Sequence, residues 1–73
     1  MVKDSIYECT YYTSEGLVDG SAYFRCINIH HVIASAKRKL LSVQVEFQFD
    51  DIALVSSLHT GALYLIRKVR DCS

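Results

Sequence analysis

The segment that most constrains the fold has its apolar residues at helical spacing. From Asn28 to Leu41, five apolar residues fall on one side of a helix: Ile29, Val32, Ile33, Ala36 and Leu40. This spacing is typical of a helix that buries one face. Asn28 is a good N-cap, because its side-chain oxygen can accept a hydrogen bond from the free amides of the first turn. The sequence therefore predicts a single helix from Asn28 to Leu41.

Two segments before this helix favour strands. Residues 6–13 and 22–27 are rich in Tyr, Ile, Cys, Thr and Phe, which are types that fit a half-buried pleat. Residues 14–21 hold two glycines and two acids, a composition typical of a turn. We therefore expect a strand, a loop and a second strand.

The clearest alternation in the chain follows the helix. Apolar Val43, Val45, Phe47 and Phe49 alternate with polar Gln44, Glu46 and Gln48. A period of two indicates a strand with one buried face and one wet face.

Three strands in a meander are predicted for the C-terminal half. Asp50 and Asp51 favour a turn, because acids in that position commonly bond to their own backbone. Residues 52–58 and 62–69 then flank a short connection in which Gly61 supplies a positive φ. The alternative is a short helix over residues 52–58, capped by Asp51.

The predicted order is ββαβββ, which is an α+β class: an antiparallel sheet of about five strands with one helix on one face, in a single domain of residues 1–73. One helix cannot cover both faces of such a sheet. We expect the far face to be polar unless a second chain covers it. Its expected members are Gln44, Glu46 and Gln48, with Tyr12 or Tyr23 from the flanking strands.

Length and composition restrict the function. The 73 residues carry eight basic and eight acidic side chains, so the formal net charge is zero, and 51% of them are hydrophobic. This balance argues against disorder and against the strong field of a histone-like nucleic-acid binder. A chain of this length buries about 60% of its unfolded surface, which leaves little room for a deep substrate cleft. We expect a protein that is not an enzyme.

Compartment signals are few. The N-terminal residues lack the apolar stretch of a secretion signal, and the uncharged run from Ile52 to Leu65 contains too many polar residues to cross a membrane. The odd set of Cys9, Cys26 and Cys72 suits reduced thiols. We expect the chain in the cytoplasm.

No catalytic residue, metal site or cofactor site is predicted. Cys26 and His30 are four residues apart and could begin a zinc site, but a structural zinc site normally has a second close pair of ligands. His30 and the adjacent His31 diverge by about 100° on a helix and cannot share a site. The glycines are too dispersed for a phosphate-binding loop.

The charges are segregated along the chain. Residues 1–24 carry one lysine against four acids, a net charge of minus three, and residues 25–42 carry four cations and no acid. Residues 43–57 carry three acids, and residues 58–73 carry three cations against one acid. We expect the basic helix end and the basic last strand to lie together and, with exposed tyrosines, to bind a partner. The candidate partner-binding residues are Lys37, Arg38, Lys39, Arg67, Lys68, Arg70, Tyr12 and Tyr23.

The layout resembles that of small phage-encoded anti-CRISPR proteins. The likeness covers most of the chain: a short strand pair, the single helix with Ala36-Lys37-Arg38-Lys39-Leu40, and a C-terminal meander that ends at Asp71-Cys72. It carries over no functional residue. It implies a protein of the host-cell cytoplasm that binds a CRISPR effector complex and blocks its nucleic-acid path without chemistry of its own.

Three hypotheses follow for the function. The first is a protein-binding module that acts as a phage or mobile-element inhibitor. The second is a small nucleic-acid-binding module, with the same cations on phosphates and tyrosines stacked on bases. The third is a structural subunit that dimerises through the uncovered sheet face or an edge strand.

Overall fold

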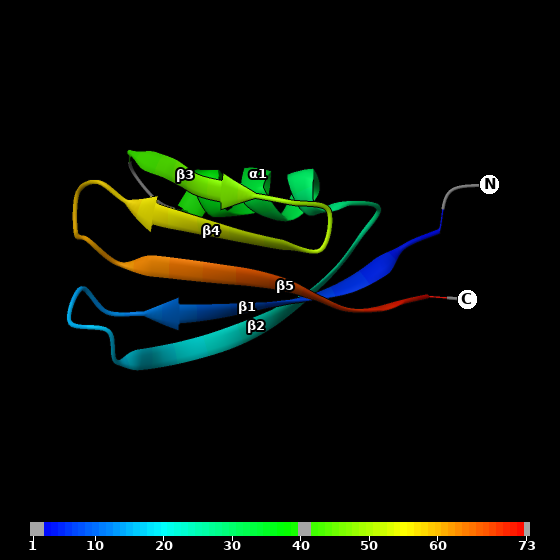
Figure 1. Cartoon of the computed structure of the whole chain (residues 1–73), viewed down its shortest axis with the longest axis horizontal. Coiled ribbons are helices and arrows are strands. Elements are labelled where there is room, and N and C mark those ends of the chain that lie inside the picture. The colour runs from blue at the N-terminus through cyan, green and yellow to red at the C-terminus, as the bar shows by residue number, and fades with distance from the viewer. Residues whose placement is uncertain (1–2, 40–41, 73) are drawn as a thin grey trace.

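The computed structural model describes residues 3–39 and 42–72. It consists of one five-stranded antiparallel sheet and one helix in the order ββαβββ, which confirms the predicted α+β class (Figure 1). The elements are β1 (Ser5–Tyr12), β2 (Val18–Cys26), α1 (Ile29–Lys39), β3 (Val43–Gln48), β4 (Ile52–Ser57) and β5 (Leu63–Asp71). The strand order across the sheet is β2-β1-β5-β4-β3.

The last strand lies at the centre of the sheet. β5 pairs with β1 on one side and with β4 on the other, so Ile66 lies opposite both Cys9 and Ala53. All three side chains are buried, and Ile66 is 0% exposed. The core therefore joins the first strand of the chain to the last.

The helix connects the two edge strands across one face of the sheet. Because every neighbouring pair is antiparallel, β2 and β3 run in the same direction, and α1 returns the chain from one edge to the other (Figure 1). Ile29, Val32 and Ile33 are buried in a cluster with Tyr7 and Val55. The apolar stripe predicted for the helix is thus its contact with the sheet.

The helix starts where the sequence predicts. The Asn28 side-chain oxygen accepts a hydrogen bond from the backbone N–H of His31 at 3.4 Å, as an N-cap does. α1 extends to Lys39, while the predicted end at Leu40 and Leu41 lies outside the described residues.

Two boundaries test the strand predictions. Residues 52–57 form a strand, so the alternative of a short helix there is wrong. β2 begins at Val18, four residues before the predicted start, because Gly20 and Ser21 pair with Tyr11 and Thr10. At the end of β4, Gly61 adopts the predicted positive φ, at 78°.

A β-bulge in β3 overturns the prediction of one continuous apolar face. Val45 lies opposite Val55, but Phe47 lies opposite the next residue, Leu54, so Glu46 is the extra residue. One additional residue moves each of the following side chains of the strand to the opposite face of the sheet.

The consequence is visible on both sides of the sheet. Val43 and Val45 pack against the core under α1, whereas the rings of Phe47 and Phe49 lie together on the other face with centroids 5.8 Å apart. Gln48 points to the helix side instead, where its Nε2 lies 2.9 Å from Nδ1 of His30.

The central position of Ile66 makes it a sensitive site for stability. The change Ile66→Val removes one methylene from a side chain that is 0% exposed. We expect the free energy of unfolding to fall by about 1 kcal/mol, through lost burial and the small cavity left behind. Urea denaturation followed by circular dichroism, at one fixed protein concentration, measures the change.

Leu58→Val is the matched control, because it removes the same group from a turn residue that is 64% exposed. Its effect should stay below about 0.5 kcal/mol. Equal losses in the two variants would contradict the assignment of Ile66 to the core.

A candidate protein-binding face

The sheet face turned away from α1 has an apolar centre. None of the residues in 3–39 and 42–72 forms a helix over this face, which we call the open face, and it is turned toward the viewer in Figure 1, with α1 behind β3 and β4. Its middle row follows the strand register: Phe47 lies opposite Leu54, and Leu54 lies opposite Leu65. The apolar centre consists of Tyr12, Phe47, Phe49, Ile52, Leu54, Leu63 and Leu65.

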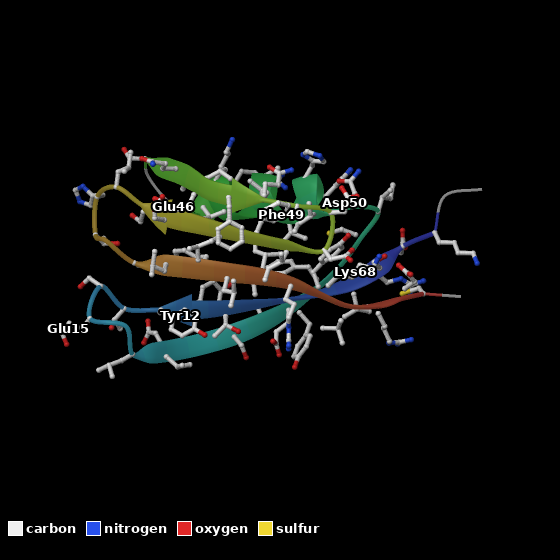
Figure 2. The ribbon with its side chains drawn as sticks, in the orientation of Figure 1. Tyr12, Glu15, Glu46, Phe49, Asp50 and Lys68 are labelled. Carbon is white, nitrogen blue, oxygen red and sulfur yellow. The ribbon has the colours of Figure 1, made fainter. Side chains whose placement is uncertain are left out.

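These side chains are partly or largely exposed to solvent. Phe49 is 65% exposed at the end of β3, while Tyr12, Leu54 and Leu65 are half-buried by their neighbours (Figure 2). The centre of this face is therefore apolar, as the prediction allows only where a second chain covers it, and the predicted placement of Gln48 on this face is wrong. The bulge brings two Phe rings to this face, and β4 and β5 place apolar residues on both of their faces.

A polar network borders the apolar centre over β1 and β2. Glu8 accepts two hydrogen bonds, from Nη2 of Arg67 at 2.9 Å and from the Tyr23 hydroxyl at 3.1 Å. The hydrogen bond to Glu8, and then the negative charge of Glu8, raise the pKa of the Tyr23 hydroxyl. The three side chains form one row across β5, β1 and β2, in which the charges of Glu8 and Arg67 neutralise each other.

At the opposite border of the open face, two polar side chains also form a hydrogen bond with each other. The Ser56 hydroxyl donates to Oε1 of Glu46, the bulge residue, at 2.7 Å. Figure 2 labels Glu46, which lies on the edge strand β3. Its carboxylate is thus held by a neighbour on the adjacent strand.

The structure does not bring the two predicted basic clusters together. α1 begins beside the last residues of β5, because Cys26 lies opposite Ser5 and Ser5 lies opposite Asp71. It ends where β3 begins, and Val43 lies opposite Ser57 near the start of β5. Lys37 and Arg38 therefore lie at one end of the molecule and Arg67, Lys68 and Arg70 toward the other.

Part of the basic charge is also paired. Nζ of Lys68 lies 2.9 Å from a carboxylate oxygen of Asp71 and 3.4 Å from one of Asp51, and the hydrogen bond with Asp71 raises the pKa of the Lys68 amine. Lys68 lies opposite Tyr7, on the helix side of the sheet. Arg70 and Lys37 are exposed, and the side chain of Lys39 lies outside what the structure describes.

Both candidate tyrosines lie on the open face. Tyr12 pairs with Leu63 of β5 within the apolar centre, and Tyr23 is 64% exposed at the polar border. Their placement on this face is as predicted, while their role in binding stays a prediction.

The remaining candidates from the sequence are Asp51, in the predicted turn, and Cys26, in the possible zinc pair. Asp51 lies in the turn between β3 and β4, and its carbonyl oxygen accepts from the backbone N–H of Lys68 at 2.7 Å. Burial, and then the nearby Asp4, raise the pKa of the Cys26 thiol. Within the described ranges, no group of three or more His, Cys, Asp or Glu residues is placed to hold a metal ion. No helix in the described part of the chain is both long enough and apolar enough to cross a membrane.

Comparisons of the chain with protein-family models, with curated proteins and with solved structures found no match.

The open-face leucines escaped the sequence prediction, although the sequence carries a signal for them. Ile52 to Val55 and Leu63 to Ile66 are apolar at every position, without the alternation of a strand that has one wet face. Such runs are typical of strands that are covered on both faces. These apolar runs predict a second apolar face of the sheet. The charge clusters of the sequence do not predict such a face.

The network at Glu8 can be tested by titration. The change Glu8→Gln removes the negative charge and keeps a hydrogen-bond acceptor. We expect the pKa of Tyr23 to fall, because its neutral hydroxyl no longer donates to a carboxylate. The ultraviolet absorbance of tyrosinate, followed against pH, measures the change.

Tyr23→Phe provides the matched background. In that background the same Glu8→Gln change should leave the remaining tyrosine titration where it was. A Tyr23 titration that does not respond to Glu8→Gln would contradict the hydrogen bond.

Proposed function

We propose that the chain is a non-enzymatic protein-binding module and that the open face is its binding surface. The observation that carries the proposal is the apolar centre, in which Phe47, Leu54 and Leu65 lie in one row on a face without a cover among the described residues. Monomeric proteins rarely expose continuous apolar patches of more than a few hundred Å². A patch of this kind is typical of an interaction surface.

The chemistry of the face fits the same proposal. The cores of protein interfaces are depleted in charged residues and enriched in aromatic ones, while their rims are polar. Here Phe47, Phe49 and Tyr12 lie in the apolar centre, and Glu8 and Tyr23 lie at its border. The two hydrogen bonds to Glu8 hold its side chain in place at this border.

The role of an inhibitor, which the resemblance to anti-CRISPR proteins implies, stays a prediction within this proposal. Inhibition by occlusion requires only that a rigid surface binds and blocks a partner, and the open face would be that surface. A nucleic-acid-binding role has less support, because the basic clusters are separated and Arg67 and Lys68 are paired with carboxylates.

Cross-linking from the open face tests the proposal. A photo-reactive benzoylphenylalanine replaces Phe47, which is 36% exposed, and the protein is irradiated inside living cells that express it. We expect a discrete adduct, because a residue in the centre of an interface lies within reach of the partner. The mass of the adduct is read by denaturing electrophoresis and mass spectrometry.

The same amino acid at Ala34 is the control, since Ala34 is exposed but lies on α1, on the other side of the sheet. It should give little or no adduct. The proposal fails if the Phe47, Phe49 and Leu65 positions all give no more product than the Ala34 position.

A further inference from the structure

We infer that the partner of the open face is a second copy of this chain, bound face to face as a two-fold β-sandwich. The inference rests on the proposed function, because it names the occupant of the same surface. Two sheets that pack in this way lie about 10 Å apart with their strands nearly aligned. The second apolar face of β4 and β5 would then become the core between the two copies.

The size of the face fits a stable dimer. In the plane of Figure 1 the molecule measures 39 by 20 Å, which bounds the projected area of the open face at about 780 Å². A standard interface buries about 800 Å² on each partner. The whole outline of the open face is therefore needed to reach the area of one standard interface, so the polar borders lie in the interface together with the apolar centre.

The charges of the face favour a copy of itself over a charged partner. A surface selected for an oppositely charged protein keeps an excess of one sign. Here Arg67 neutralises Glu8. Glu46 keeps its negative charge while its carboxylate accepts a hydrogen bond from Ser56, and Arg70, which lies opposite Ile6 on the same face, adds one positive charge. The whole chain has a formal net charge of zero, so two copies approach without long-range repulsion.

The position of the apolar row suits two-fold symmetry. In a two-fold interface the same patch serves both subunits, so it must be complementary to itself. Leu54 and Leu65 lie on the two middle strands of the apolar centre, and the rows on either side pair Ile52 with Arg67 and Ser56 with Leu63. A two-fold axis near this pair places each leucine row against the same row of the other copy.

The small size of the chain gives a reason for dimerisation. Its cysteines are thiols, and its described core under α1 contains eight buried apolar residues. Domains below about 80 residues gain little from a single core and often add oligomerisation. Packing of two open faces supplies a second core without a longer chain.

Sedimentation equilibrium and light scattering of the full chain test the inference. We expect the unmodified chain to approach twice its 8.3 kDa mass as its concentration is raised to about 1 mM. Leu65→Glu should weaken dimerisation roughly a hundredfold or more, because two-fold symmetry buries the unpaired charge twice. Ala34→Glu, at an exposed position of α1 behind the sheet, should leave the dimer unchanged.

A second measurement decides the matter if Leu65→Glu fails to fold. Isotope-labelled and unlabelled chains of native sequence are mixed, and isotope-filtered nuclear Overhauser effects are recorded. We expect intermolecular signals at the methyl groups of Leu54 and Leu65.

Two results overturn the inference: an 8.3 kDa monomer at every concentration, or a folded Leu65→Glu variant that stays a dimer. The cross-linking from Phe47 separates this failure from failure of the proposed function. A monomeric chain that still cross-links to a different protein rejects the second copy and keeps the binding face. A monomer with no adduct rejects both.

Discussion

Packing of the α1 stripe against one face of the sheet is the interaction on which the rest of the structure depends. The helix runs along the strands and is about 10 Å across, whereas five strands at about 4.8 Å spacing make a sheet about 19 Å wide. It links the two edge strands and can cover only the face that it crosses. The contact of Ile29, Val32 and Ile33 with Ile66 and its neighbours therefore fixes one face as the core and leaves the other open.

The bulge at Glu46 decides what lies on each of these faces. Without it, Phe47 would follow Val45 to the helix side and Gln48 would face away. With it, Gln48 meets His30 at the start of α1, where a polar contact is close to solvent, and the two Phe rings join the open face. The bulge residue is itself accommodated, because its carboxylate accepts the hydrogen bond from Ser56. One extra residue thus moves aromatic surface from the core to the exterior.

The sequence predicts the local structure well and the long-range structure poorly. Helix spacing, the Asn28 cap and the turn at Gly61 depend on neighbouring residues, and the structure confirms them. The pairing of β1 with β5 joins residues more than fifty positions apart. The bulge at Glu46 contains no glycine that would indicate it in the sequence. Charge clusters are visible in the sequence, but the partners of a cation such as Lys68 appear only when the chain is folded.

Exposed sheet edges compete with exposed faces as sites of association, and here the edges are the weaker candidates. β3 is short and bulged at Glu46, and β2 carries Asp19 and Arg25 along its length. Short strands, bulges and charges are the usual means by which proteins prevent pairing at an edge. The apolar runs of β4 and β5 lie on interior strands of the sheet and have no such protection on the open face. The proposed association therefore uses the face of the sheet, where the strands keep their own hydrogen bonds and would contribute side chains alone.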